Sequence, residues 1–224
     1  MIFILAGLNI DRSPVEYLEA VAIPTRSLKG HLDRLATHAG GGIILSTCNR
    51  TEVYAVVDDV EVGIRQLKEI IGAIPDEAPG GDFSDHIYTL TGDDVVTHLF
   101  SVTSGLHSVA LGESQILGQV TRALQAAGEA GTVKPALSRM FHAALRNSRR
   151  VRKESGLGRN RISISSLGVQ ELQNVAGDLK GLSVLLIGAG ETGKLTARAL
   201  RRYGADDIVV TSRSMNRGSI LAEE

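Results

Sequence analysis

Cysteine, tryptophan and long apolar runs are scarce or missing in this sequence, and each absence excludes a class of protein. The single cysteine, Cys48, cannot form an internal disulfide or a cysteine-based zinc site, so no metal centre is predicted. The apolar opening, MIFILAGLNIDRSP, breaks at Gly7, is too short to cross a membrane and has no basic leader. A formal net charge of -1 gives the chain as a whole no attraction for a polyanion. We therefore expect a globular, cytoplasmic protein.

The apolar fraction of 43% is enough to fill a core, and the pattern of apolar residues predicts an α/β fold. IFILAGLN has the pattern of a strand buried on both faces, and IILST and EVYAVVD have the pattern of two neighbouring strands. Helical patterns occur at residues 13–23, 26–37 and 61–73, and HIYTL is a last short strand. This order predicts an N-terminal mixed-sheet βα domain.

From residue 92 to 178 the pattern is helical, and then its period changes. LSVLLIGAGETGKLTARALRRYGADDIVVTSRS has the pattern of a buried strand, a glycine-rich turn, an amphipathic helix and a second buried strand. That order is the first βαβ unit of a Rossmann-type dinucleotide-binding fold. We predict an N-terminal domain with a helical extension at 1–160, a linker helix at 161–181 and the beginning of a Rossmann-type domain at 182–224.

A G-x-G-x-x-G motif lies directly after the first of these strands and at the start of the helix. Its first glycine permits a tight turn, its second lets a pyrophosphate approach the backbone, and its third lets the helix pack on the strand. The context favours nucleotide binding, and the alternative is a purely structural glycine turn. The predicted cofactor residues of the turn are Gly188, Ala189, Gly190, Glu191, Thr192 and Gly193.

The second strand of the unit ends in VVTSRS, without the acidic residue that commonly holds the ribose hydroxyls of NAD. Ser212 and Arg213 instead offer a hydroxyl and a guanidinium, which suit a 2′-phosphate. We therefore predict NADPH as the cofactor. An ordinary polar strand end is the alternative.

A basic run, RNSRRVRKESGLGRNR, occupies residues 146–161 and contains one acidic residue, Glu154. Such a cluster can hold phosphate groups electrostatically. It contains no aromatic residue on which unpaired bases would stack. A solvated helical face explains the run equally well.

Three polar features also have ordinary explanations. Cys48 follows an apolar run, where a lone cysteine is commonly a small buried hydrophobe. His98 is flanked by apolar residues, as a histidine at the edge of a core would be. In SGLHSVALGESQILGQV, glycines punctuate a run whose polar side chains can line a pocket, although helix capping explains part of the pattern.

Four segments, LSTCNRTEVY, SGLHSVALGESQILGQV, SRRVRKES and VLLIGAGETGKL, occur in this order and together closely resemble glutamyl-tRNA reductase. The resemblance covers nearly the whole chain. It implies NADPH-dependent reduction of glutamyl-tRNA(Glu) to glutamate-1-semialdehyde, the first step of tetrapyrrole synthesis by the five-carbon route. Glutamyl-tRNA(Glu) is thus the implied partner, and glutamate-1-semialdehyde aminomutase, which uses the aldehyde, is a further candidate.

The resemblance also implies roles for individual residues. Cys48 corresponds to the nucleophile that attacks the aminoacyl ester and holds glutamate as a thioester. His98 matches a histidine important for activity, and Arg50 is a natural clamp for the substrate carboxylate. The residues implied around the glutamyl group are Thr47, Asn49, Arg50, Ser108, Glu113, Ser114, Gln115 and Gln119.

The sequence departs from the family in two ways. Many relatives have proline where this chain has Ser114. The family also continues through a complete NADPH domain and a helical domain that forms the homodimer, whereas this sequence stops at Glu224. Two rival functions stay open: another NADP-dependent oxidoreductase of small molecules, in which Cys48 is dispensable, and a tRNA- or partner-binding module without reductase turnover.

Overall fold

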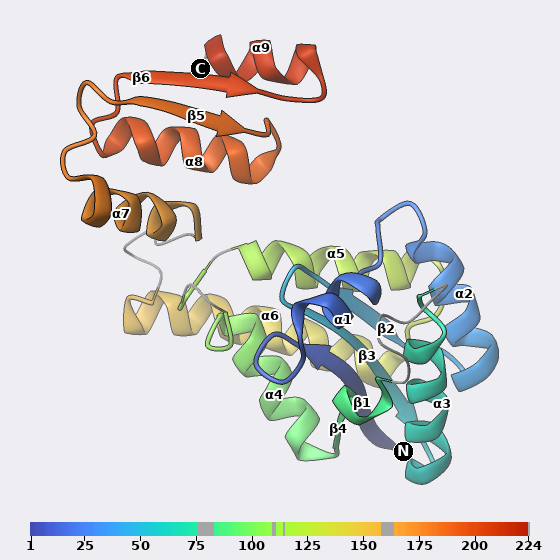
Figure 1. Cartoon of the computed structure of the whole chain (residues 1–224). Helices are drawn as coiled ribbons and strands as arrows, with labels where there is room; N and C mark the ends of the chain where they lie inside the picture. Colours follow the sequence, from blue (N-terminus) through green and yellow to red (C-terminus); the bar gives the residue numbers. More distant parts are fainter. Residues whose placement is uncertain (76–82, 109–110, 114, 158–163, 224) are drawn as a thin grey trace. The chain divides into compact units, whose positions relative to one another are not determined.

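The computed structural model describes residues 1–75, 83–108, 111–113, 115–157 and 164–223. The chain divides into two compact units (Figure 1). Unit 1 comprises Met1–Ser108 and Ser114–Leu157, and unit 2 comprises Val109–Glu113 and Gly158–Glu224.

Unit 1 is built on a four-stranded sheet with the strand order β2-β3-β1-β4. Its strands are β1 (Ile2–Asn9), β2 (Ile43–Ser46), β3 (Arg50–Val57) and β4 (Tyr88–Thr91). Its helices are α1 (Val15–Ala20), α2 (Leu28–Ala39), α3 (Val60–Gly72), the short 3₁₀ helix η1 (Ser84–His86), α4 (Asp93–Ser104), α5 (Gln115–Glu129) and α6 (Pro135–Ser155). Up to β4, the main elements follow the β-α-β-β-α-β order of a split βαβ motif.

The predicted α/β class is confirmed, with one correction: the sheet of unit 1 is not mixed, because every strand pair in the described residues is antiparallel. The crossover through α1 and α2 does return the chain so that β2 runs in the same direction as β1. However, β3 turns back from β2 and inserts between the two, which leaves β1 with antiparallel neighbours on both sides.

Helices cover both faces of this sheet, so alternate residues along a strand pack on opposite sides of it. On one face Ile4 packs against α3, where Gly63 leaves room for it: a Cβ on Gly63 would lie 2.7 Å from Ile4 Cδ1. On the other face Tyr54 meets Phe141 of α6 edge to face, with ring centroids 5.1 Å apart. Tyr54 and Phe141 are fully buried, and burying a large apolar side chain contributes about 1.5–3 kcal/mol.

Unit 2 contains two parallel strands, β5 (Ser183–Ile187) and β6 (Asp207–Thr211), with the helices α7 (Ile164–Ala176), α8 (Glu191–Arg202) and α9 (Met215–Glu223). This is the predicted beginning of a Rossmann-type domain. Val169 of α7 and Leu179 share a small core with Leu200 of α8, although both lie in the span predicted as a linker. On the opposite side of the strands, Leu185, Ile187 and Val209 are exposed.

The helices in the described residues are not suited to crossing a membrane, since none is both long and apolar enough.

Candidate functional site

Cys48 lies at the tip of the hairpin that joins β2 to β3. The loop of residues 47–49 is held by Thr47, whose backbone N–H donates to Arg50 O at 2.8 Å. The Thr47 hydroxyl oxygen accepts from the backbone N–H groups of Asn49 at 3.1 Å and Arg50 at 3.2 Å. The tip is tied to the end of β1 by Ile10 N–H, which donates to Asn49 O at 3.0 Å. Cys48 is exposed there, so its interpretation as a buried hydrophobe is wrong.

A buried carboxylate lies near the start of β3, the strand that follows this tip. Glu52 is fully buried on β3. Its Oε1 accepts from Arg50 Nη1 at 2.8 Å and from the Tyr88 hydroxyl at 2.6 Å, and it lies 2.9 Å from His98 Nε2. Its Oε2 accepts from the Tyr54 hydroxyl at 2.5 Å. Glu52 therefore joins β3, β4 and α4 in one hydrogen-bonded cluster.

The partners of Glu52 keep it ionised in spite of its burial. Burial alone would raise the pKa of the carboxyl group, but the hydrogen bond from His98 and the charge of Arg50 lower it to about 2. Burial and the neighbouring Glu52 charge raise the pKa of both Tyr54 and Tyr88, so both phenols remain hydrogen-bond donors. The cluster thus contains a carboxylate whose charge is balanced by a guanidinium.

The strand geometry explains how these side chains meet. Arg50, Glu52 and Tyr54 alternate along β3 and so lie on one face. Gly7 pairs with Glu52 across the sheet, and a Cβ on Gly7 would lie 2.8 Å from Glu52 Cγ. Gly7 also pairs with Tyr88 on its other side. A residue without a side chain therefore makes room for the carboxylate between its partners.

Arg50 is held from two directions. Besides its contact with Glu52, its Nη2 donates to the backbone oxygen of His107 at 2.7 Å. The exposed His107 ring stacks on the His98 ring, with centroids 5.7 Å apart and planes 29° apart. Partial burial and the charges of His98 and Arg50 lower the pKa of His107. The segment after α4 is thereby fixed beside the cluster, and Ser108 follows directly in the chain.

The predicted substrate residues are brought together only in part. The hairpin tip and the adjoining cluster of unit 1 contain Thr47, Cys48, Asn49, Arg50 and His98, and Ser108 follows His107 of that cluster in the chain. Gln115 and Gln119 are one turn apart on α5, and Gln119 lines a pocket beside β2. Glu113 belongs to unit 2, where burial raises its pKa. Ser114 lies outside the described residues.

Sequence reasoning missed Glu52, Tyr54, Tyr88 and His107. One signal was present: in RTEVY, polar and aromatic residues alternate along a strand whose aliphatic neighbours predict burial on both faces. Tyr88 and His98 are 36 and 46 residues from Glu52, and no local pattern links positions so far apart.

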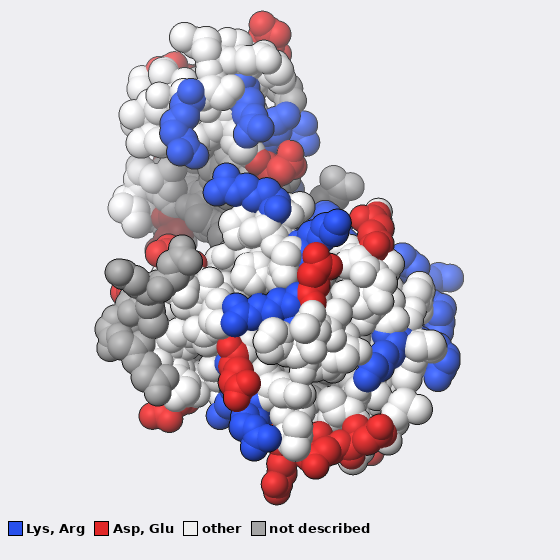
Figure 2. Space-filling view, turned by 90° about the vertical axis from the view of Figure 1, so that its right-hand side faces the viewer, with Lys and Arg blue, Asp and Glu red and all other residues white. Residues whose placement is uncertain are grey.

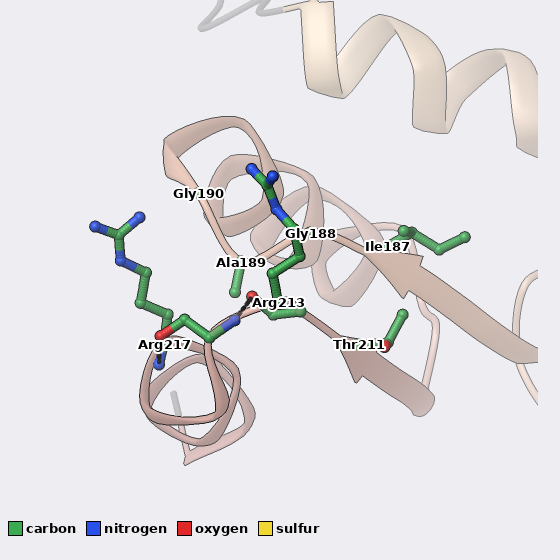
Figure 3. Close-up of a pocket in the computed structure, with 9 residues that line it drawn as sticks. Ile187, Gly188, Ala189, Gly190, Thr211, Arg213 and Arg217 are labelled. Atoms are coloured by element: carbon green, nitrogen blue, oxygen red, sulfur yellow. Dashed lines mark hydrogen bonds between the residues drawn. The ribbon is translucent and has the colours of Figure 1, made fainter.

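Unit 2 contains a pocket of about 710 Å³ at the carboxyl ends of β5 and β6 (Figure 3). It is lined by Ile187, Gly188, Ala189, Gly190, Thr211, Ser212, Arg213, Ser214 and Arg217. Five of the predicted cofactor residues are among these, whereas Glu191, Thr192 and Gly193 are not. Arg217, which the sequence analysis did not single out, places a second guanidinium on this pocket from α9.

The glycine turn fits a dinucleotide. Gly188 has φ of +109°, a conformation that side chains disfavour. A Cβ on Gly193 would lie 2.1 Å from Gly188 O, so this glycine permits the close packing of helix and strand. A Cβ on Gly190 would meet nothing within 4 Å, which leaves that backbone open to a ligand. Arg213 and Arg217 line the same pocket, and two guanidinium groups suit a phosphate such as the 2′-phosphate of NADPH.

Residues 146–155 of the basic run form the C-terminal half of helix α6, and some of their exposed side chains are paired. Arg150 Nε lies 2.9 Å from Glu154 Oε1 one turn later. Arg146 and Arg149 line a groove of about 430 Å³ between α5 and α6. Arg159 and Arg161 lie outside the described residues. In the view of Figure 2, basic and acidic groups are interspersed rather than gathered into one field.

Each unit matches a different family model, and similar relatives span both units. The family described as "Glutamyl-tRNAGlu reductase, N-terminal domain" matches residues 6–155, and "Shikimate / quinate 5-dehydrogenase" matches residues 170–224. A glutamyl-tRNA reductase from Aquifex aeolicus is 40% identical over 98% of this chain and 53% of its own length. One from Pelotomaculum thermopropionicum is 38% identical over 100% of this chain and 51% of its own length.

The fold gives the same result. The solved structure of glutamyl-tRNA reductase from Methanopyrus kandleri superimposes with a TM-score of 0.63 and 31% identity, over 99% of this chain and 52% of that one. The chain thus spans about half the length of the relatives named above. The family match covers two thirds of the residues, and the antiparallel sheet with Cys48 at a hairpin tip is followed in the sequence by the beginning of a Rossmann-type domain. The chain therefore belongs to the glutamyl-tRNA reductase family.

Proposed function

We propose that Cys48 accepts the glutamyl group from glutamyl-tRNA(Glu) and that NADPH reduces the resulting thioester to glutamate-1-semialdehyde. The observation that carries the proposal is the placement of the thiol: Cys48 is exposed at a hairpin tip, two residues before an arginine that a buried carboxylate holds in place. In this proposal residues 1–160 perform the acyl chemistry, 161–181 form a linker, and 182–224 begin the cofactor domain.

The first step is acyl transfer. The Cys48 thiolate attacks the ester carbonyl carbon, an S–C bond forms, and the C–O bond to the terminal ribose breaks. The ribose oxygen takes up a proton, and tRNA leaves with a free hydroxyl. The thioester is then more open to reduction than the original ester. Reduction breaks the C–S bond, releases the aldehyde and regenerates the thiolate.

Arg50 is proposed to recognise a carboxylate of the glutamyl group. A guanidinium has five N–H donors, of which one is bound to Glu52 and one to the backbone oxygen of His107. The remaining donors are held in a fixed orientation, which lowers the entropic cost of binding. Arg50 is only 3% exposed, so a carboxylate bound to these donors would be shielded from water.

His98 is proposed to hold Glu52, and through it Arg50, rather than to stand alone. Its Nε2 is 2.9 Å from Glu52 Oε1, and its side chain is largely buried. The stacked His107 is the more exposed of the two rings and lies on the solvent side of the cluster.

The pocket of unit 2 is proposed to hold NADPH. The backbone of the turn from Gly188 to Gly190 would face the pyrophosphate, and Arg213 and Arg217 would hold the 2′-phosphate. Bound NADPH supplies a hydride to the acyl carbon.

Mass spectrometry of the protein after incubation with glutamyl-tRNA tests this proposal. We expect a glutamyl adduct on Cys48 in the wild type and none in Cys48→Ser. The serine variant should stay folded, because the side chain is exposed and the two residues are similar in size. An NADP oxidoreductase of small molecules would neither form the adduct nor release tRNA. A tRNA-binding module would retain tRNA in a binding assay without forming the adduct.

A further inference from the structure

A second pocket of unit 1, of about 430 Å³, runs along the outer edge of the sheet. Three parts of the chain enclose it: β2 with residues 44–46, the segment before and at the start of α2, and one face of α5. β2 is an edge strand, so one side of its backbone has no neighbouring strand to bond. The pocket is therefore bordered by main-chain hydrogen-bonding groups as well as by side chains.

This pocket begins beside the proposed nucleophile. Ser46 lines it and lies two residues before Cys48, so the two Cα atoms are at most about 7 Å apart. Gln119, which the sequence predicts at the substrate site, lines it from α5. Arg50 and Glu52 lie one strand further in, on β3, where they contact α4 through His98. Along the chain, Cys48 thus lies midway between Ser46, which lines the pocket, and Arg50, which is bound to Glu52.

The walls combine apolar surface with a few polar groups. Ile23, Leu28 and Ala126 provide apolar area. Gln119 and Arg122 provide an amide and a positive charge on one face of α5, since they are three residues apart. The Gln125 amide is fixed by its hydrogen bond to Glu129 Oε1 at 2.8 Å. Apolar walls suit the faces of a nucleobase, glutamine amides can bond the edge of adenine, and arginine suits a phosphate.

We propose that this pocket binds the 3′-terminal adenosine of the aminoacylated tRNA, with Arg122 toward its 5′-phosphate. The inference rests on the proposed function, because the ester that Cys48 attacks joins the glutamyl group to the ribose of that nucleotide. The leaving nucleoside must therefore lie next to the sulfur. The glutamyl group occupies the Arg50 side, and the pocket on the Ser46 side is large enough for a nucleoside.

Single-turnover acylation of Cys48 by two donors tests the proposal in the full chain. One donor is glutamyl-tRNA, and the other is the ethyl thioester of the glutamate α-carboxyl group, which has no nucleoside. Ala126→Phe fills the pocket and should slow acylation by glutamyl-tRNA roughly 10-fold or more, the scale of a lost base-stacking contact. Acylation by the thioester should stay within about twofold, since it makes no such contact. Thr121→Phe, on the neighbouring groove of α5, is the matched control.

Arg122→Gln tests the phosphate contact, with Arg65→Gln on α3 as the control for a lost surface charge. Arg122→Gln should slow the acylation of Cys48 by glutamyl-tRNA and leave acylation by the ethyl thioester unchanged. Equal slowing of both donors, or equal effects of the variants and their controls, would overturn the nucleoside site while leaving the proposed function intact.

Direct binding separates the two proposals. Anisotropy of a 5′-labelled CCA trinucleotide requires no catalysis, and we expect Ala126→Phe and Arg122→Gln each to weaken its binding. If neither donor acylates the wild type, the proposed function is wrong, and the trinucleotide still decides whether the pocket takes a nucleoside. If Ala126→Phe fails to fold, Arg122→Gln and competition between the trinucleotide and glutamyl-tRNA decide instead. Undiminished binding to Arg122→Gln, or no competition, would then count against the site.

Discussion

Glu52 occupies a strand position where the flanking sequence predicts an aliphatic residue. It is fully buried, yet every contact described above favours its charged form. Its folded-state pKa of about 2 lies below the ordinary value of 4.5. A depressed carboxyl pKa contributes stability that is present above the unfolded value and is lost as pH falls toward the folded value.

Glu52→Gln should therefore remove part of the acid sensitivity of unit 1. In the wild type, we expect the free energy of unfolding to fall between about pH 5 and pH 2 as this carboxylate gains a proton. At pH 7 the variant should be less stable by about 3–5 kcal/mol, because Arg50 is left buried without its partner. Urea unfolding at several pH values measures both effects. Glu61→Gln on the exposed start of α3 is the control, and parallel pH profiles for wild type and Glu52→Gln would refute this account.

Arg217 allows a similar test in unit 2. Arg217→Gln should weaken NADPH binding about 10- to 150-fold, since a charge-assisted hydrogen bond contributes about 1.5–3 kcal/mol. NADH binding should be unchanged because NADH has no 2′-phosphate. Arg202→Gln, on α8 and away from the pocket, controls for net charge. Equal weakening of both nucleotides by Arg217→Gln would show that the side chain supports the fold rather than the phosphate.

The resemblance to a known family implied roles for some of these residues, whereas residue types alone did not. Cys48, Arg50 and His98 were accessible through their motifs, and the exposure of Cys48 agrees with a chemical role. The carboxylate that orients Arg50 and His98 was not accessible, because its partners come from β4 and α4 and are joined only by folding. Arg217 was missed because it lies six residues after Thr211, the last residue of β6, on the first turn of a helix that the sequence analysis did not predict.

At the scale of elements, continuous apolar strands were predictable and their pairing was not. IFILAGLN is β1 as predicted, and the short IILST and EVYAVVD runs contain β2 and most of β3. Continuous apolar and alternating patterns depend only on neighbouring residues, so they predict where a strand lies in the sequence. The neighbour of β1 is decided by β3, which turns back at the hairpin tip and pairs with β1. For that reason the sheet is antiparallel, whereas the local patterns had suggested a mixed sheet.

The glycine turn between β5 and α8 separates folding from ligand binding within one motif. Gly193→Ala places a Cβ 2.1 Å from a backbone oxygen, so it should destabilise unit 2. Gly190→Ala meets no protein atom within 4 Å, so it should leave stability unchanged and weaken only NADPH binding. Hydrogen exchange of the β5 amides reports stability, and nucleotide titration reports binding. If Gly190→Ala also increases hydrogen exchange in β5, Gly190 contributes to the stability of unit 2. If NADPH binding stays intact, the backbone at Gly190 does not contact the nucleotide.

At the scale of the whole molecule, the two units differ in how completely their sheets are covered. The sheet of unit 1 has helices on both faces and a continuous core. The two strands of unit 2 expose Leu185, Ile187 and Val209 on one face. Exposed apolar surface of this kind contributes no stabilisation from burial. We therefore expect unit 1 to be more stable than unit 2. The proposed acyl transfer, which needs only unit 1, should then persist under conditions that abolish the proposed reduction.

In the proposed function, acylation needs Cys48 and its surroundings in unit 1, whereas reduction also needs NADPH held by the less completely covered unit 2. The 224-residue chain should therefore cleave glutamyl-tRNA at the same rate with and without NADPH, and should release free glutamate as water hydrolyses the thioester. It should form little semialdehyde. Quantifying tRNA, glutamate and semialdehyde from one reaction tests this, with Cys48→Ser as the blank and the longer Aquifex aeolicus relative as the comparison. Abundant semialdehyde would show that two strands suffice to hold NADPH productively, and an inert protein would show that the hairpin tip needs more than unit 1 to become reactive.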